Sequence, residues 1–223
     1  MKRSVCIAID GPAGAGKSTV AKMLASKLGY VYVDTGAMYR AVTYQALVDK
    51  ITIEDPFALT KLAEDIDLSL KVDAAGHTRI FINEKDVTQE IRRPEVSSNV
   101  SLVSRLPGVR HVLTRLQREL AAQGGIVMEG RDIGTLVLPG AEKKFFLTAS
   151  VEERARRRFL ELQQNGYQVD YEQVIKDISL RDEIDSNRAI APLKPAPDAM
   201  IIDCTGLTAE QVVNMLLCIV SGG

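Results

Sequence analysis

Apolar residues follow two different periods along the chain. Runs of consecutive apolar residues, many of them β-branched, predict buried strands, and apolar residues three or four positions apart predict helices. The strand-like runs are SVCIAI (4–9), YVYV (30–33), the apolar part of GGIVMEGRDIG (124–134), KKFFLTA (143–149) and AMIIDCT (199–205). The helix-like segments are 17–28, 34–48 after a short loop, 94–122 in two pieces broken at Pro107-Gly108, 151–164, 171–188, and 208–220 with Thr208 as N-cap. Strands that alternate with helices indicate an α/β fold with a parallel sheet.

Two segments interrupt this regular alternation. Within residues 66–92, DLSLKV, HTRIFI and KDV alternate polar and apolar residues, and the turn formers DAAG and NE separate them. This pattern predicts a small antiparallel sheet inside a mixed lobe near 36–104. The second interruption, 151–188, consists of two highly charged helices joined at NGYQVD and predicts a helical hairpin.

Composition excludes several classes of protein. The 223 residues carry a formal net charge of −1, so no overall basicity points to a nucleic-acid polymer or to an acidic membrane. Three cysteines far apart argue against a disulfide framework or a zinc site, and we expect Cys6 and Cys204 to be buried free thiols. The apolar run near the N-terminus is too short for a signal peptide, and no stretch approaches 18 apolar residues. We therefore expect a cytoplasmic protein that acts without a membrane.

The segment GPAGAGKS (11–18) matches the phosphate-binding pattern G-x-x-x-x-G-K-[ST] between a predicted strand and a predicted helix. Small residues let the backbone wrap around phosphate, and the helix N-terminus favours negative charge. Lys17 is expected to reach the β- and γ-phosphates, and the Ser18 hydroxyl to join Mg²⁺. The residues expected to bind ATP in this loop are Gly11, Pro12, Ala13, Gly14, Ala15, Gly16, Lys17, Ser18 and Thr19.

Polar residues after two other core strands predict a second anionic ligand. DTGAMYR follows the second strand, and EGRDIG follows the strand near residue 126. Because ligands bind at the carboxyl ends of parallel strands, these side chains should lie near the phosphate-binding loop. The candidates are Asp34, Thr35, Tyr39, Arg40, Arg131 and Asp132. A GTPase would need N-K-x-D, which is absent, and a motor ATPase would need a strand ending in consecutive carboxylates.

Arginine spacing on the two charged helices suggests a lid. Arg181, Asp185 and Arg188 share one helix face, and so do Arg154, Arg157 and Arg158. A ladder of surface ion pairs explains either helix taken alone. Both helices, however, are inserted late in a protein with a phosphate-binding loop. This position favours a lid that carries arginines to phosphates.

Five segments in order make the chain resemble the bacterial cytidylate kinase family: IDGPAGAGKST, DTGAMYR, EGRDIGT, ERARRR and RDEIDSNRAIAPL. The resemblance runs from about residue 4 to residue 217. It implies a nucleoside monophosphate kinase fold, with a central parallel sheet flanked by helices, an acceptor-binding lobe containing a small antiparallel sheet, and an Arg-rich helical lid. A single kinase domain, 1–223, would comprise a core (1–35, 105–150 and 189–223), an acceptor lobe (36–104) and a lid (151–188).

The resemblance also implies roles for individual residues. Arg40, Arg131 and Arg188 match positions that hold the phosphate of CMP, and Asp185 matches the ribose contact. Ser101, Arg110 and Asp132 match positions that read cytosine, although an ordinary helix surface position also suits Ser101. The remaining residues expected at CMP are Thr35, Tyr39 and Arg181, and those expected at ATP are Arg154, Arg157 and Arg158.

The implied reaction transfers the γ-phosphoryl group of ATP to CMP or dCMP. Lys17, Arg131, Arg157 and Arg188 would supply the catalytic positive charge, and Asp34 or Glu129 would hold Mg²⁺ through water. A monomer is the family expectation. Two alternatives stay open: a kinase for another small acceptor, such as shikimate, gluconate or a different nucleotide, and a nucleotide-dependent switch without acceptor turnover.

Overall fold

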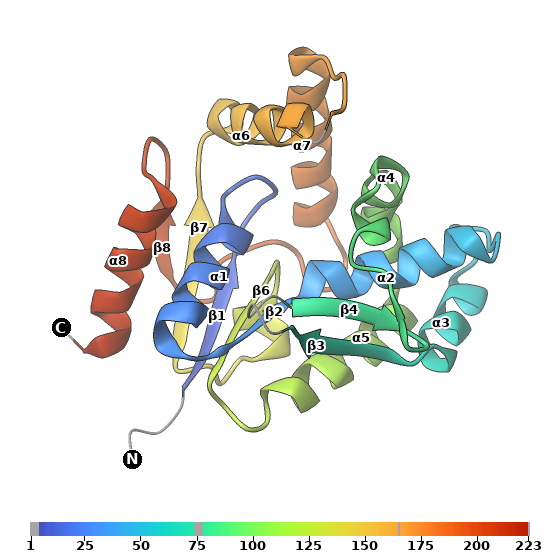
Figure 1. Ribbon diagram of the computed structural model, residues 1–223, viewed down its shortest axis with the longest axis horizontal. Helices are drawn as coiled ribbons and strands as arrows, with labels where there is room; N and C mark the ends of the chain where they lie inside the picture. The colour runs from blue at the N-terminus through green and yellow to red at the C-terminus, as the bar shows by residue number, and fades with distance from the viewer. Residues whose placement is uncertain (1–4, 74–77, 165, 223) are drawn as a thin grey trace. The chain divides into compact units, whose positions relative to one another are not determined.

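The computed structural model describes residues 5–73, 78–164 and 166–222 (Figure 1). The chain falls into two compact units, one formed by Met1–Tyr32 with Gly124–Gly223 and the other by Val33–Gln123. The second unit includes the helix at 107–121, which the sequence analysis assigned to the core. The functional lobe boundaries 36–104 and 151–188 stay predictions.

A five-stranded sheet forms the centre of the first unit, in the order β2-β6-β1-β7-β8. Its strands are β1 (Cys6–Asp10), β2 (Val31–Asp34), β6 (Ile126–Gly130), β7 (Lys143–Thr148) and β8 (Met200–Asp203). β1 pairs in parallel with both β6 and β7, and β7 pairs in parallel with β8. The predicted parallel α/β sheet is confirmed, and its register sets Asp10 opposite Gly130 at the carboxyl ends of β1 and β6.

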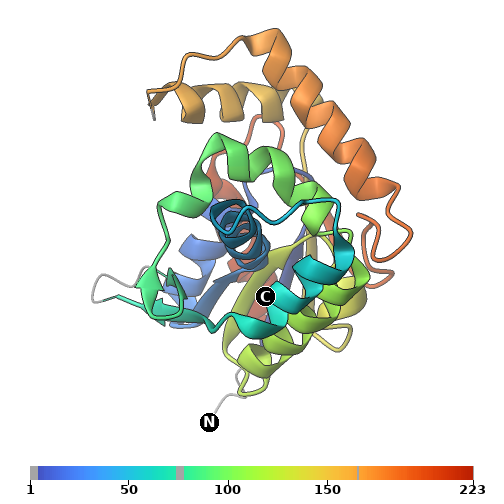
Figure 2. The same cartoon turned by 90° about the vertical axis from the view of Figure 1, so that its right-hand side faces the viewer.

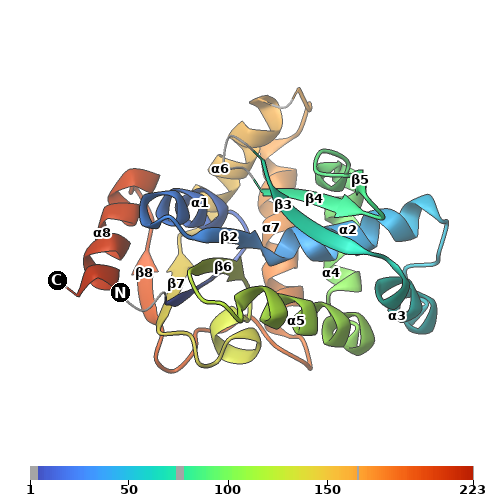
Figure 3. The ribbon, with the colours of Figure 1, turned by 60° about the horizontal axis from the view of Figure 1, so that its bottom comes forward.

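Two helices cover one face of this sheet, α1 (Lys17–Leu28) and α8 (Ala209–Ser221) (Figure 3). α1 ends at Gly29, whose left-handed φ of 67° lets its amide reach back to the last turn. Thr208 is the N-cap of α8, as expected, and forms a capping box with Gln211. The core between the sheet and these helices contains Ile7, Ile9, Leu24, Phe145, Leu147, Val213 and Leu216.

The predicted hairpin of charged helices is confirmed as α6 (Val151–Gln164) and α7 (Tyr171–Ser186) (Figure 2). A small apolar cluster of Ala155, Val174 and Ile178 holds the two helices together. The rings of Phe159 and Tyr171 add an edge-to-face contact, with centroids 5.5 Å apart. Asn165, the first residue of the expected joint, lies outside the described residues, and Asp170 at its end caps α7.

The second unit combines helices with the small antiparallel sheet expected from the sequence. Its order is β3-β4-β5, and the NE turn at 83–84 is confirmed by positive φ values at both residues. The expected DAAG turn covers 73–76, of which 74–76 lie outside the described residues. The elements are α2 (Thr35–Val48), α3 (Pro56–Asp65), β3 (Leu68–Val72), β4 (Thr78–Ile82), β5 (Lys85–Asp86), η1 (Glu90–Arg92), α4 (Pro94–Val103) and α5 (Pro107–Ala121).

Three details of this unit differ from the sequence interpretation. No loop precedes α2, because Asp34 caps it directly after β2 and accepts the Ala37 amide. The helix α3 was not anticipated, although Asp55 as N-cap and Pro56 in the first turn are ordinary start signals. The two predicted helical pieces within 94–122 are confirmed as α4 and α5, but the break lies at 104–106 and Pro107 begins α5. Proline fits a first turn, whose amides have no partner within the helix.

No helix among the described residues is long and apolar enough to cross a membrane. The three cysteines are free. Cys204 is buried as expected, whereas Cys6 is only partly buried.

Replacing Gly11 tests how closely β1 approaches β7. Gly11 has a φ of +147°, and a Cβ there would lie 2.0 Å from the Leu147 carbonyl oxygen. We expect Gly11→Ala to lower the free energy of unfolding by roughly 2–5 kcal/mol, because backbone atoms must separate. Gly140→Ala is the matched control, since no atom lies within 4 Å of its Cβ. Equal stability of both variants in urea denaturation would contradict the close approach.

Candidate functional site

The phosphate-binding loop connects β1 to α1 as predicted. Gly16 precedes the helix in a left-handed conformation, with a φ of 88°. The amides of Ala13, Gly14 and Gly16 donate to no protein acceptor among the described residues. Ser18 and Thr19 are exposed at the start of α1. A helix start with available amides and an exposed hydroxyl suits a phosphate and its metal ion.

Lys17 folds back over this loop and donates from Nζ to the Pro12 carbonyl oxygen at 2.7 Å. Its side chain is buried, and burial lowers the pKa of the ammonium to about 7, with the nearby Arg131 lowering it further and Glu129 opposing. A phosphate would supply the negative charge that the ammonium lacks here.

Two lid arginines hold the backbone of the same loop. Arg154 of α6 donates to the Ala13 carbonyl at 3.1 Å and to Asp182 of α7 at 2.6 Å. Arg157 donates to the Ala15 carbonyl of the loop at 3.5 Å, and also to the Cys204 carbonyl at 2.7 Å and to Glu153 at 2.8 Å. The structure thus brings two of the three lid arginines to the loop, as the shared face predicted.

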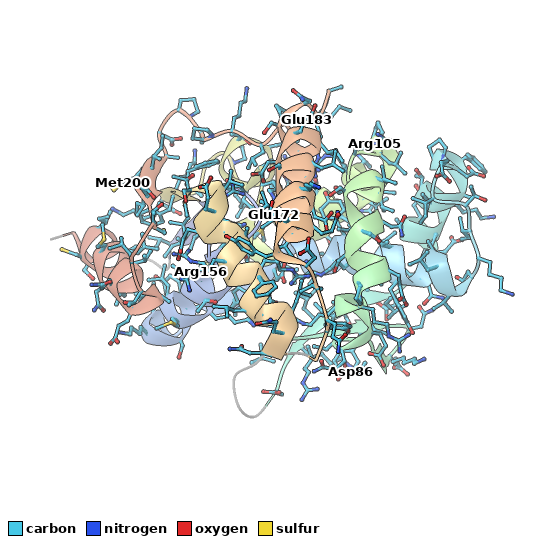
Figure 4. All side chains as sticks on the ribbon, turned by 90° about the horizontal axis from the view of Figure 1, so that it is seen from above. Asp86, Arg105, Arg156, Glu172, Glu183 and Met200 are labelled. Carbon is cyan, nitrogen blue, oxygen red and sulfur yellow. The ribbon has the colours of Figure 1, made fainter. Side chains whose placement is uncertain are left out.

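The third lid arginine, Arg158, pairs with Glu161 on α6 at 2.9 Å. Arg156 and Glu172, labelled in Figure 4, are exposed on the same hairpin. Gly14 permits the close contact between loop and lid, because a Cβ at this position would lie 2.9 Å from the Arg154 carbonyl oxygen. The lid and the loop are therefore packed together in the first unit.

A cavity of about 140 Å³ lies beside the loop. Arg157 forms one wall, and the lining is otherwise mainly apolar, with Val20, Leu207 and Val212 among its residues. Its position between α1, the lid and the segment after β8 suits a flat apolar group attached to a phosphate held in the loop.

Arg131, Asp185 and Arg188 form a charged cluster at the end of β6. Arg131 donates from Nε to Asp185 at 2.9 Å, and Arg188 donates to the other carboxylate oxygen. Burial alone would raise the pKa of Asp185, but Arg131, Arg188 and Arg181 together hold it below its usual value. Three guanidinium groups around one buried carboxylate leave a net positive charge, which suits an anion.

Asp10, the last residue of β1, is a part of the site that the sequence analysis missed. It is 3% exposed, and its two carboxylate oxygens accept the amides of Ile133 and Gly134, each at 2.8 Å. These amides belong to η2, a π-helical turn (Ile133–Val137) that directly follows Arg131 and Asp132. An aspartate ending a strand just before the glycine loop was the available signal.

The second unit carries the other predicted acceptor residues. Arg40 donates to Asp34 at 2.8 Å, and Thr35 is buried beside them at the start of α2. Burial would raise the pKa of Asp34, but Arg40 and the Ala37 amide hold it below its usual value. Both Asp34 oxygens are therefore already engaged.

Arg110, Tyr39 and Ser101 lie near one another within this unit. The Arg110 guanidinium carbon is 5.8 Å from the centroid of the Tyr39 ring, and its Nη1 donates to the Ser104 carbonyl at 3.2 Å. The Ser104 hydroxyl donates in turn to the Ser101 carbonyl at 3.2 Å. Ser101 is 7% exposed, so it is not an ordinary surface position of α4.

The oxygen ligands available for a divalent cation are few, which suits a magnesium ion that binds together with a nucleotide. No group of three or more His, Cys, Asp or Glu side chains that could hold a metal occurs among residues 5–73, 78–164 and 166–222. Glu129 is buried and accepts a hydrogen bond from the Tyr32 hydroxyl. Because Mg²⁺ usually keeps several waters and takes substrate phosphates as ligands, Ser18 and one carboxylate acting through water suffice.

Comparison with known proteins decides the family. A sequence model of the cytidylate kinase family matches residues 7–221. The chain belongs to the cytidylate kinase family. A cytidylate kinase of Desulforamulus reducens is 55% identical over 223 residues, covering 100% of each chain. One of Pelotomaculum thermopropionicum is 56% identical over 217 residues, covering 97% of this chain and 96% of the relative.

Solved structures agree at the level of the fold. A shikimate kinase from Bacteroides thetaiotaomicron superimposes with a TM-score of 0.50 at 14% identity, covering 97% of this chain and 98% of its own. A protein from Eubacterium ventriosum described as uncharacterized gives 0.54 at 13% identity, covering 98% and 99%. The resemblance seen in the sequence and the phosphate-loop kinase fold are thereby confirmed, and the roles of the individual site residues stay predictions.

The lowered pKa of Lys17 makes nucleotide binding a proton-linked event. Above about pH 7 the free protein holds Lys17 largely neutral, and the ATP phosphates favour its charged form. We expect uptake of up to about one proton per MgATP at about pH 8. Calorimetric titrations in buffers of different ionisation enthalpy measure this uptake. Lys17→Arg, which stays charged, should show none, and the same uptake by both proteins would contradict the assignment.

Proposed function

We propose that this protein transfers the γ-phosphoryl group of MgATP to CMP or dCMP, giving ADP and CDP or dCDP. One observation carries the proposal beyond the family assignment. The parallel pairing of β1 with β6 sets two anion-binding features side by side, the glycine loop after Asp10 and the arginine cluster that begins at Arg131. Two phosphates that must react with each other need two such features at adjacent strand ends.

The donor occupies the glycine loop. Its phosphates take the available loop amides and Lys17, and Ser18 holds Mg²⁺, with Asp34 or Glu129 acting through water. Mg²⁺ supplies positive charge that offsets the charge of the triphosphate. The donor base enters the cavity walled by Arg157, where a planar guanidinium and apolar side chains accept a flat ring.

Arg131 and Arg188 bind the acceptor phosphate, and the resemblance assigns the same role to Arg40. Asp185 holds the first two guanidinium groups in place and offers its carboxylate to the ribose, with Arg181 beside it. Thr35 and Tyr39 complete this part of the acceptor site.

Asp132 reads the amine of cytosine, and the resemblance assigns Arg110 and Ser101 to the same base. A carboxylate accepts from the exocyclic amine of cytosine, and a guanidinium donates to the ring acceptors. Uracil presents a carbonyl in place of the amine, so Asp132 would face it unfavourably. Tyr39 supports the Arg110 guanidinium, and the Ser104 carbonyl fixes its orientation.

The transfer step needs no protein nucleophile. Charge spreads over the oxygens of the transferred group, so catalysis consists of positioning and electrostatic stabilisation by Lys17, Arg131, Arg157 and Arg188. The acceptor phosphate is ionised at neutral pH and needs no strong general base. The lid helices exclude water and so limit hydrolysis of ATP. We further propose that the protein acts in the cytoplasm as a monomer on these small molecules, without a nucleic-acid polymer.

Acceptor-dependent release of ADP tests the proposed reaction. We expect strong turnover of MgATP with CMP and dCMP and little with UMP, AMP or shikimate. Cytosine offers an amine to Asp132 together with two ring acceptors to Arg110, whereas uracil has no amine, adenine lacks the ring carbonyl and shikimate has no base. A coupled assay measures ADP with each acceptor and with none. Preference for another acceptor would identify a different small-molecule kinase, and equal release without acceptor would identify an ATPase or a switch.

Removing the Asp132 carboxylate tests the reading of cytosine. We expect Asp132→Ala to narrow the kcat/KM ratio of CMP to UMP by roughly 10- to 100-fold, because one base contact is lost. Steady-state kinetics with both acceptors measure the ratio. Asp177→Ala, at an exposed position of α7, is the control. If the kcat/KM ratio of CMP to UMP equals that of the unsubstituted protein, Asp132 does not recognise the base.

A further inference from the structure

Asp132 occupies the N-cap of the π-helical turn η2, yet its side chain does not cap that turn. An aspartate at an N-cap ordinarily accepts the amides of the first helical residues, which ties its carboxylate to its own backbone. Here Asp10 takes that place from β1. Its oxygens accept the Ile133 and Gly134 amides, which are the first two of the turn.

The parallel register explains how a residue 123 positions away can act as the cap. Asp10 lies opposite Gly130, so the chain after Gly130 turns directly over the end of β1. Gly134 packs closely at this point, because a Cβ there would lie 3.1 Å from the Lys144 side chain and in ordinary contact, at 3.4 Å, with the Asp10 Oδ2.

Burying a charged carboxylate costs free energy unless hydrogen bonds or opposite charges compensate for the lost water. Asp10 forms no ion pair among the described residues, and the two amides are its hydrogen-bond donors. π-helical turns are rare and concentrate at functional sites, because they re-aim side chains within a short segment. The turn capped by Asp10 begins immediately after the two residues, Arg131 and Asp132, that the acceptor is proposed to meet.

We infer that Asp10 is a positioning residue for acceptor recognition, which caps the π-helical turn and thereby fixes the backbone from which Asp132 is proposed to meet the cytosine amine. This inference rests on the proposed base-reading role of Asp132. It also links the two substrates, because Asp10 is followed directly by Gly11 of the donor loop. Asp10 therefore lies directly before the donor loop and also fixes the turn that follows Arg131 and Asp132.

The variant Asp10→Asn separates this role from a merely structural one. Its amide group keeps the size of the side chain, but only one oxygen accepts, and its NH₂ group opposes the second backbone amide. The turn is then held less firmly, and the backbone of Asp132 with it. We expect the CMP to UMP ratio of kcat/KM to narrow by roughly 5- to 50-fold, with KM for CMP rising more than KM for ATP.

A double-mutant cycle makes the test specific. If Asp10 acts through Asp132, adding Asp10→Asn to Asp132→Ala should leave the CMP to UMP ratio at the value of Asp132→Ala alone. The matched control is Glu142→Gln, because Glu142 accepts the Cys6 amide at the opposite end of β1. This control should keep the ratio of the unsubstituted protein, and circular dichroism reports whether each variant is folded.

The unsubstituted protein offers a second measurement that needs no variant. Burial raises the pKa of Asp10 to about 6, with the Gly134 and Ile133 amides and Lys17 opposing and Asp132 adding to the rise. Because a protonated carboxyl cannot accept both amides, the CMP to UMP ratio should decline as the pH falls through about 6. The phosphates of the two acceptors ionise alike, so their protonation cancels in the ratio.

The experiments distinguish a failure of the role inferred for Asp10 from a failure of the base-reading role proposed for Asp132. If Asp132→Ala narrows the ratio while Asp10→Asn lowers both activities equally, Asp10 is only structural and the inference is wrong. A ratio that stays constant between about pH 5.5 and 8 overturns it in the same way. If Asp132→Ala itself leaves the ratio unchanged, the base-reading role fails first, and the inference fails with it.

Discussion

Repulsion between arginines is the constraint on which the site depends. Guanidinium groups must lie close together before a phosphate arrives, and each raises the energy of the others. Two carboxylates resolve this conflict: buried Asp185 between Arg131 and Arg188, and partly buried Asp182 beside Arg154. Each carboxylate also fixes the orientation of its arginine, so little side-chain freedom remains to be lost on binding.

Carboxylates also lie between neighbouring arginines in the lid helices. Glu153 accepts from Arg156 and Arg157, and these two hydrogen-bonded partners hold the pKa of Glu153 near 2. The fully buried core of this charged hairpin is small, with Ala155, Val174 and Ile178 surrounded by partly buried apolar side chains such as Phe159 and Tyr171. Its packing on the glycine loop therefore depends on ion pairs and backbone contacts, which are weaker and more easily rearranged than an apolar core.

The parts of the site that could be predicted are those encoded within a few neighbouring residues. The glycine loop, the order of strands and helices, and the capping of α8 by Thr208 are of this kind. The cap formed by Asp10 could not be predicted, because it depends on the pairing of β1 with β6 across 123 positions. Likewise, helical spacing groups Arg158 with Arg154 and Arg157, but Glu161 one turn later takes the Arg158 side chain. The helix α3 was missed because ten residues make a weak periodic pattern.

The route of the chain between the two units has an evolutionary consequence. The Val31 amide donates to the Gly125 carbonyl at 2.8 Å, so the strands that lead out to the second unit and back from it are joined where they leave the central sheet. Everything between them is one uninterrupted insertion with adjoining ends. An insertion of this kind can lengthen, shorten or be exchanged by recombination while the central sheet and the glycine loop keep their structure. Because Arg131, Asp132 and Asp185 lie outside this insertion, such an exchange would alter only one part of the proposed acceptor site.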